Sequence, residues 1–345
     1  MSQENQGEAV HAAREIELLD RAKRSHVELA EAIASRVVGQ DDVVELMLVA
    51  LLASSHALLV GVPGLAKTLL VSSLAEALDL QFGRVQFTPD LLPSDITGAD
   101  VLVDDGTGQN GQSRRSIRFL PGPIFANLVL ADEINRTPPK TQAALLQAMQ
   151  EKRVTVGSET HRLPDPFLVF ATRNPIEQEG TYALPEAQLD RFLLEIHVDY
   201  PSEAEEREIA RRTTSATPGV VKRVLTADEV RELQALVPRI PVTDEAVKLA
   251  VALARATRPK AAGGTGKVRA VEDYVRYGAG PRGSQALVLA AKARAALRGE
   301  AAAQADDVRA LVVPVLRHRL VLSYRAEADG IRDVDVLSQL LAAVS

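Results

Sequence analysis

The stretch HALLVGVPGLAKTLLVSSLAEAL, residues 56–78, decides the fold. It opens with a short, almost entirely apolar run, continues through a loop of small residues and ends in a pattern with helical spacing. Such apolar runs are typical of strands that are buried on both faces of a parallel sheet. The stretch therefore predicts a strand, a tight loop and a helix, in that order.

The loop between the strand and the helix has the composition of a phosphate-binding loop. Small residues let successive backbone N–H groups converge on phosphate oxygens, and the start of the helix adds positive potential. Lys67 can reach the β- and γ-phosphates, and the Thr68 hydroxyl can ligate magnesium. Ala66 replaces the usual final glycine, and its methyl group is tolerable if that position has ordinary helical dihedrals. The predicted phosphate-binding residues are Gly61, Val62, Pro63, Gly64, Leu65, Ala66, Lys67 and Thr68.

Further apolar runs alternate with helical patterns up to Pro201. They are RVQF (84–87), NLVLAD (127–132), FLVFAT (167–172) and FLLEIHV (192–198). This alternation predicts an α/β domain with a parallel sheet flanked by crossover helices. Two polar hairpins are also expected, at residues 100–121 and 152–163, the second with its turn at Gly157-Ser158.

Beyond Pro201 the strand-like runs stop and alanine-rich helical patterns begin. Helix starts are predicted by a capping box at Thr226, an N-cap at Thr243 and a first-turn proline at Pro281. Residues 261–270 are predicted to be a loop. At the other end of the chain, one helix is expected from about Ala9 to Arg36. We therefore divide the chain into an N-terminal helical extension (1–35), an α/β nucleotide-binding domain (36–201) and a helical lid domain (202–345).

Residues with catalytic chemistry follow the later strands. Asp132 and Glu133 end a buried run, where one carboxylate can hold magnesium and the next can orient the attacking water. Asn174 follows another strand and could align the same water, or it could form an Asx turn. Arg191 precedes the last predicted strand and Arg282 opens a lid helix. Their guanidinium groups suit a developing phosphate charge, and the alternative for each is a surface ion pair.

The order of these blocks resembles the AAA+ ATPases, and more closely their MoxR family. The resemblance rests on GVPGLAKT (61–68), QFTPDLLPSDITG (86–98), FLPGPIFANLVLADEINR (119–136), ATRNPIEQEGTYALPEAQLDRF (171–192) and VRYGAGPRGSQAL (275–287). It extends from about Val38 to the C-terminus. The resemblance implies an ATPase of the helix-2-insert branch that uses ATP and Mg2+, with a parallel sheet and a helical lid.

The same resemblance implies roles for individual residues. Lys67 and Thr68 fall in the Walker A motif, and Asp132 and Glu133 fall in Walker B, with Thr68 and Asp132 as the metal-binding pair. The segment that lies against adenine in AAA+ proteins is matched by Val38, Gly39 and Gln40.

Three further residues match AAA+ positions that act in catalysis. Asn174 corresponds to sensor 1, Arg191 to the arginine finger and Arg282 to sensor 2. The sequence Gly-Pro-Arg-Gly around Arg282 departs slightly from the commoner small-Pro-Arg-Ala pattern, which leaves the geometry of sensor 2 open. An arginine finger acts on a neighbour's nucleotide, so the resemblance implies a homo-oligomer, a hexameric ring.

Composition narrows the class of partner. The 345-residue chain has a formal net charge of −6, 3% aromatic residues and no cysteine. The absence of cysteine excludes disulfide scaffolds and thiolate metal sites, and the histidines show no metal-ligand spacing. Acidic charge and scarce aromatics disfavour nucleic-acid binding. No apolar run is long enough for a membrane span and no signal-peptide pattern is present, so we expect a cytoplasmic protein.

The leading hypothesis is therefore a ring-forming ATPase that remodels or matures a partner protein. From the resemblance, the partner carries a von Willebrand factor A domain and the role is chaperone-like or metal-inserting. The alternatives are a metallochelatase-type motor subunit, a nucleic-acid-associated AAA+ motor, and a nucleotide-gated binding module with little turnover.

Overall fold

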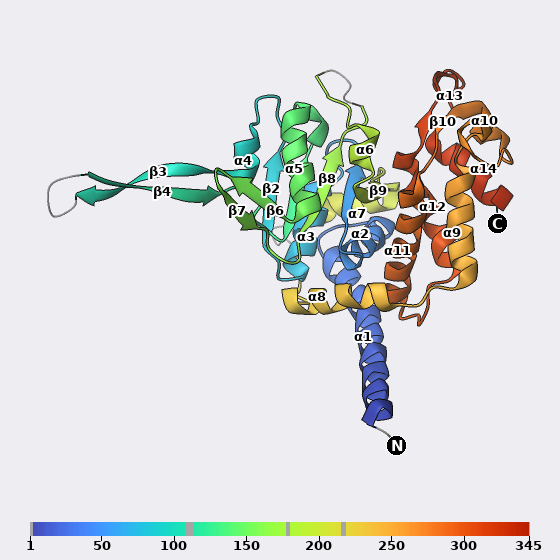
Figure 1. Ribbon diagram of the computed structural model, residues 1–345, viewed down its shortest axis with the longest axis horizontal. Coiled ribbons are helices and arrows are strands. Elements are labelled where there is room, and N and C mark those ends of the chain that lie inside the picture. Colours follow the sequence, from blue (N-terminus) through green and yellow to red (C-terminus); the bar gives the residue numbers. More distant parts are fainter. Residues whose placement is uncertain (1–2, 108–112, 177–179, 215–218, 345) are drawn as a thin grey trace.

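The computed structural model describes residues 3–107, 113–176, 180–214 and 219–344 (Figure 1). Its centre is a five-stranded sheet with the order β2-β5-β8-β1-β9, in which every pair is parallel. The strands are β1 (His56–Val60), β2 (Phe82–Gln86), β5 (Leu128–Asp132), β8 (Leu168–Arg173) and β9 (Phe192–His197). Each lies within two residues of a predicted run, so the prediction of a parallel α/β sheet is confirmed.

The sheet separates two apolar cores. Leu58 and Leu59 are adjacent in β1 and fully buried, yet they belong to different cores, because successive side chains of a strand point to opposite faces. The Leu59 core includes α2 (Asp41–Leu52) and α3 (Lys67–Ala77), while the Leu58 core includes α5 (Pro139–Glu151). Burial on both faces explains why β1, β5 and β8 read as continuous apolar runs, whereas the edge strand β2 is mostly exposed.

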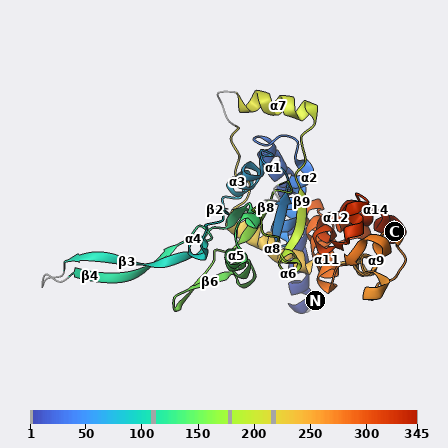
Figure 2. The ribbon, with the colours of Figure 1, turned by 90° about the horizontal axis from the view of Figure 1, so that it is seen from above.

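Both predicted hairpins are present. After the short helix α4 (Pro93–Thr97), β3 (Gly98–Thr107) and β4 (Ser113–Pro121) pair antiparallel and extend far from the body (Figures 1 and 2). The tip of the first predicted hairpin, residues 108–112, lies outside the described residues. The second hairpin pairs β6 (Arg153–Val156) with β7 (Glu159–Arg162) around the predicted turn. The two hairpins meet where Phe119 stacks on His161, with ring centroids 3.9 Å apart.

Helix α1 (Gln3–Ala34) begins upstream of the predicted start and ends two residues before Arg36. Its C-terminal part packs against α2, α3 and α11 (Pro281–Arg298), and its N-terminal part projects from the body (Figure 1). Between the sheet strands lie η1 (Ile134–Arg136) and α6 (Glu186–Leu189), and α7 (Glu203–Thr213) follows the sheet. Among the described residues, no helix has the length and apolarity that crossing a membrane requires.

The C-terminal part is mainly helical, as predicted. Beside α11, its helices are α8 (Ala227–Leu236), α9 (Asp244–Ala256), α10 (Arg269–Tyr274), α12 (Ala305–Leu316), α13 (Tyr324–Ala328) and α14 (Asp333–Val344), with 3-10 turns η2 (Val237–Arg239), η3 (Lys260–Ala262) and η4 (Arg317–Arg319). The predicted capping box at Thr226, the N-cap at Thr243 and the first-turn proline of α11 are confirmed.

Two details of this part differ from the prediction. Strand structure does not stop at Pro201, because β10 (Val275–Tyr277) and β11 (Val321–Leu322) form a short antiparallel pair. These strands are too short for an alternating pattern to stand out in the sequence. In addition, the predicted loop at 261–270 is bounded by regular structure, since η3 overlaps its start and α10 begins at Arg269.

A buried arginine joins the helical lid to the sheet domain. The side chain of Arg319 is 5% exposed, and its Nε donates to Oδ1 of Asp190 at 2.8 Å. Its Nη2 also donates to the Phe192 carbonyl at 2.9 Å. Burial lowers the pKa of Arg319, and the neighbouring Asp190 carboxylate opposes that shift. The lid is therefore anchored to the segment that enters β9.

We expect Arg319→Met to lower the free energy of unfolding by about 3 kcal/mol, because it removes the buried partner of Asp190. Urea denaturation followed by circular dichroism measures this loss. Arg269→Met is the matched control, since Arg269 is 94% exposed in its ion pair with Asp273 and should matter little. Equal urea midpoints for the two variants would contradict the anchoring role.

Candidate functional site

The predicted phosphate loop lies between the buried end of β1 and the start of α3. Gly61 is required at its first position, because a Cβ there would lie 2.5 Å from the Val198 carbonyl oxygen. Lys67 begins α3, and its Nζ contacts the carbonyls of Gly61 and Val62. Partial burial lowers the pKa of Lys67, while the charges of Asp132 and Glu133 oppose that shift. The ammonium group thus lies inside the loop and faces the two carboxylates.

Ala66 differs from the expectation of ordinary helical dihedrals. It is the N-cap of α3 and has φ 57° and ψ 20°, which is the left-handed region. The chain turns there from the loop into the helix, and an alanine in this conformation costs about 1–2 kcal/mol relative to the right-handed form. The loop therefore adopts a glycine-like backbone with a methyl group attached.

The two predicted carboxylates lie at the end of β5. Thr172, on the neighbouring strand β8, is fully buried and donates to Oδ1 of Asp132 at 2.7 Å. The backbone N–H of Glu133 donates to the same threonine oxygen at 2.8 Å. Glu133 itself is in the left-handed region, with φ 57° and ψ 50°. Thr172 therefore sets the positions of both acidic residues.

Two residues of β2, which sequence reasoning missed, contact these carboxylates. Arg84 donates from Nη2 to Asp132 Oδ2 at 2.6 Å and to Gln86 Oε1 at 2.9 Å. Gln86 donates to Oε2 of Glu133 at 2.9 Å, and Arg136 pairs with that oxygen at 3.1 Å. No local sequence signal identifies them, because their contacts follow from the strand register, in which Gln86 is directly opposite Asp132.

A cavity of about 390 Å³ brings most of the predicted residues together. It is lined by residues 63–69, Arg84, Asp132, Glu133, Thr172 and Asn174. Asn174 is buried, and its Oδ1 also accepts from the Ile176 N–H, so the Asx turn and the position in the cavity occur together. The cavity therefore holds a cationic ammonium, a threonine hydroxyl and two carboxylates beside a helix N-terminus. Gly61 and Val62 do not line it, although their carbonyls contact Lys67.

A second cavity, of about 410 Å³, shares Pro63, Gly64, Leu65, Ala66 and Leu69 with the first. Its other walls include Val38, Gln40, Tyr200 and, from α7, Ile209. Most of the lining surface is apolar. Gly39 does not line it; its lack of a side chain leaves room for Glu205 of α7, since a Cβ at Gly39 would meet that side chain. An apolar cavity next to a phosphate loop fits a nucleotide base.

These residues also fit a magnesium ion held together with phosphate oxygens. Thr68 and Asp132 line the same cavity and offer the oxygen ligands that Mg2+ prefers. Among the described residues, no group of three or more histidine, cysteine or carboxylate side chains could hold a metal by itself. A metal here would thus need the nucleotide to complete its coordination.

The two predicted arginines lie elsewhere. Arg191 donates from Nη1 to the Leu146 carbonyl of α5 and does not line either nucleotide cavity. Arg282 is 67% exposed and lies 3.4 Å from Asp190, the residue before Arg191. Neither arginine lines the cavities around the phosphate loop of its own chain, and their side chains have different partners, the Leu146 carbonyl for Arg191 and the Asp190 carboxylate for Arg282.

Comparisons with known proteins agree with this architecture. Residues 56–194 match the ATPase family associated with various cellular activities (AAA), and residues 268–340 match the AAA lid domain. The chain is similar to the crystal structure of a “putative ATPase” from Cytophaga hutchinsonii, with a TM-score of 0.86 and 38% identity over 98% of each chain.

Curated relatives carry the same family name. The chain is 45% identical to Chaperone MoxR1 of Mycobacterium tuberculosis, over 90% of this chain and 79% of that protein. It is 36% identical to Protein MoxR of Paracoccus denitrificans, over 85% of this chain and 88% of that protein. The chain therefore belongs to the MoxR family of AAA+ ATPases.

Proposed function

We propose that this protein is a ring-forming ATPase that couples ATP hydrolysis to the remodelling or maturation of a partner protein. One observation supports the formation of a ring. The phosphate cavity contains Lys67, the two carboxylates and Asn174, whereas neither Arg191 nor Arg282 lines it. A cavity that lacks these arginines is completed when a second copy presents them. Head-to-tail contacts of this kind close into rings, and the hexamer follows from the family resemblance.

Within one subunit, each residue of the cavity has a distinct task. Lys67 and the N-terminus of α3 bind the phosphates, and Val38 and Gln40 lie against the base. Thr68 and Asp132 hold Mg2+, which when bound neutralises charge on the β- and γ-phosphates. Asp132 keeps its orientation through the hydroxyl of Thr172.

Glu133 orients the attacking water, and its neighbours control its direction. The Gln86 amide and the Arg136 guanidinium both contact its Oε2, and we assign the water to Oε1, which accepts no hydrogen bond from the described residues. Asn174 lines the same cavity and aligns that water from β8. The left-handed backbone of Glu133 interrupts the regular strand conformation at this residue. The Glu133 carboxylate can therefore face the water while the Asp132 carboxylate faces Mg2+.

Across the ring, Arg191 acts as the arginine finger and Arg282 acts on the same neighbouring nucleotide. The support for a role in trans is that neither arginine lines the phosphate cavity of its own chain and that Arg282 pairs with Asp190, the residue before Arg191. A guanidinium offers a planar fork of donors that matches a γ-phosphate.

The protein acts in a chaperone-like role on a client that has a von Willebrand factor A domain, with metal insertion as one form of maturation. The acidic net charge favours a protein client over nucleic acid. The proposed location is the cytoplasm. The metallochelatase-type and nucleic-acid-associated motors stay as alternatives.

We expect Glu133→Gln to retain ATP binding and to lose roughly two or more orders of magnitude in kcat, because a water-orienting carboxylate is lost. Fluorescent-nucleotide titration measures binding, and phosphate release measures turnover. Near-normal hydrolysis by this variant would exclude Glu133 as the water-orienting residue.

The trans arrangement is tested by mixing variants. We expect Arg191→Ala to bind ATP almost normally and hydrolyse it poorly, since an arginine finger contributes about 10³–10⁵ in rate. Mixed rings of Arg191→Ala and Glu133→Gln should recover activity that neither variant shows alone, because some interfaces then hold a complete site. Subunit exchange is followed by energy transfer between labelled chains. If Arg191→Ala alone hydrolyses ATP at the wild-type rate in assembled rings, Arg191 is not the finger and Arg136 is the next candidate.

The client is identified by capture. We expect rings of Glu133→Gln, locked with ATP, to retain a protein with a von Willebrand factor A domain that mass spectrometry detects. Lys67→Ala, which weakens phosphate binding, is the control and should retain less of it. Specific retention of a chelatase subunit, or a salt-sensitive DNA affinity, would favour the alternatives.

A further inference from the structure

A larger cavity lies between the sheet domain and the lid. Its volume is about 1070 Å³, and it shares no lining residue with the two nucleotide cavities. The sheet domain contributes Val60, Arg173 and Glu195, and the lid contributes Arg317 and Ile331, among others. The cavity is therefore separate from the nucleotide site and bounded by both domains.

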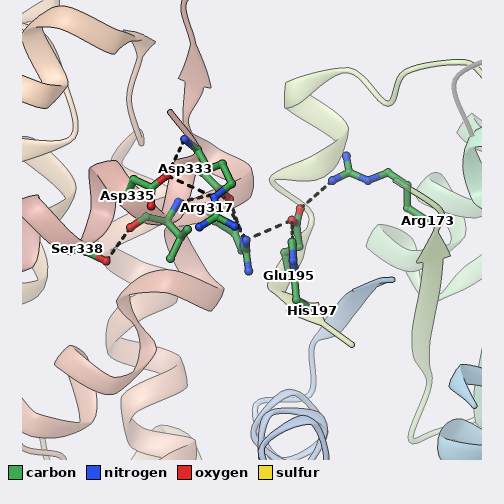
Figure 3. A network of polar contacts seen from close by, with 9 residues as sticks. Arg173, Glu195, His197, Arg317, Asp333, Asp335 and Ser338 are labelled. Carbon is green, nitrogen blue, oxygen red and sulfur yellow. Dashed lines mark hydrogen bonds and ion pairs between the residues drawn. The ribbon is translucent and has the colours of Figure 1, made fainter. Parts of the chain in front are cut away.

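An ionic network forms one wall of this cavity (Figure 3). The Glu195 carboxylate is 5% exposed and contacts three side chains, with His197 at 2.8 Å and Arg173 and Arg317 at 3.6 Å each. Arg317 also donates from Nε to Asp333 Oδ2 at 2.9 Å. The buried carboxylate is thus paired on both of its oxygens, as burial of a charge requires.

The arginines of this network have more N–H donors than these ion pairs use. A guanidinium has five N–H donors, and Arg173 makes one ionic contact, to Glu195, among the described residues. Nη1 of Arg317 has no partner within the part of the chain that the structure describes. Asp333, by contrast, accepts at both oxygens, from Arg317 and from the Val334 N–H. The unpaired groups of this network are therefore N–H donors, which can bind hydrogen-bond acceptors of a ligand.

Two further lining residues have unpaired polar atoms. Nδ1 of His318 and Oγ of Ser323 are buried without a hydrogen-bond partner among the described residues. His318 Nε2 lies 3.0 Å from the Phe192 carbonyl oxygen, which accepts, and 2.7 Å from Arg319 Nη1, which donates, so these contacts fit either tautomer of the ring. Burial and the charge of Arg319 keep the pKa of His318 well below its usual value, so the ring stays neutral. Both residues add unpaired polar atoms on the lid side.

The remaining walls combine apolar and charged side chains. The apolar ones include Leu184, Leu189, Leu320, Leu322 and Ile331, and the charged ones are Glu186, Arg276, Glu327 and Arg332. Apolar surface with a few convergent polar groups is the usual form of a small-molecule site, and this volume is slightly above the usual range of about 300–1,000 Å³.

We propose that this cavity is a second ligand site, for a small organic anion. Its carboxylate, phosphate or sulfonate group contacts Arg173 and Arg317, and its apolar body lies against the leucine walls. Arg173 is on β8, directly before Asn174, and Arg317 is on η4 of the lid. A ligand that contacts both arginines joins the sheet domain to the lid without touching the nucleotide.

The test uses the full-length protein with ATPγS and Mg2+ at saturation, which removes the nucleotide site from the measurement. The probe is 8-anilino-1-naphthalenesulfonate, and N-phenyl-1-naphthylamine, which has the same aromatic body without the charge, is its matched counterpart. We expect one saturable site per chain for the sulfonate, at least about tenfold tighter than for the uncharged probe, because each factor of ten reflects about 1.4 kcal/mol of ionic contact.

Arg173→Gln should weaken sulfonate binding about tenfold and leave binding of the uncharged probe within about twofold. Glu195 keeps His197 and Arg317 in this variant, so folding is preserved. Arg269→Gln, an exposed lid arginine outside the cavity, is the control and should bind both probes as the wild type does. The proposal is overturned if the sulfonate shows no saturable binding in the presence of saturating ATPγS, or if Arg173→Gln and Arg269→Gln bind it equally. These readouts do not depend on ATP turnover, so the site can fail without the proposed ATPase function failing.

Discussion

Strand β1 lies between β8 and β9, and all five of its residues are buried. Its neighbours extend the pairing to the point where the phosphate loop begins, with Val198 N–H donating to the Val60 carbonyl at 2.8 Å and Gly61 N–H to the Arg173 carbonyl at 3.2 Å. A shift of one residue would exchange the side chains between the two cores, so the register is strongly specified. The phosphate loop therefore starts level with the ends of β5 and β8 in the sheet. Residues from these three strands meet at that edge of the sheet.

Much of this arrangement was predictable, because each element has its own local signal. Continuous apolar runs indicated the strands, and Thr226 and Thr243 marked helix starts through their side-chain hydrogen bonds. The contacts of Arg84 and Gln86 were not predictable, since they depend on β2 lying beside β5, and strand order is a property of the whole sheet. The pairing of Glu195 with Arg317 joins residues more than a hundred positions apart and depends on how the lid docks.

Backbone conformation at the site was a further limit on prediction. Ala66 and Glu133 both have a positive φ, although neither is a glycine and their residue types gave no sign of it. Each lies where a strand or loop turns sharply towards the phosphate cavity, and the surrounding hydrogen bonds maintain the conformation. Strain of this kind is commonly located at functional sites, where the geometry of the reacting groups takes priority over local preference.

Helix α1 gives the molecule a mechanical property. It contacts α11 of the lid as well as α2 and α3 of the sheet domain, and Leu18 is the first of its described side chains to be buried. The first described ion pairs of α1 with the body are those of Arg14 with Glu232 and of Glu15 with Arg239, so the helical turns from Gln3 to Ala13 project as a rod of about 16 Å, at about 1.5 Å per residue. A rotation of about 10° at the base of such a rod would move its far end by about 3 Å. A change in the angle between lid and sheet domain that rotated α1 would therefore be larger at the projecting end than at the base of the helix.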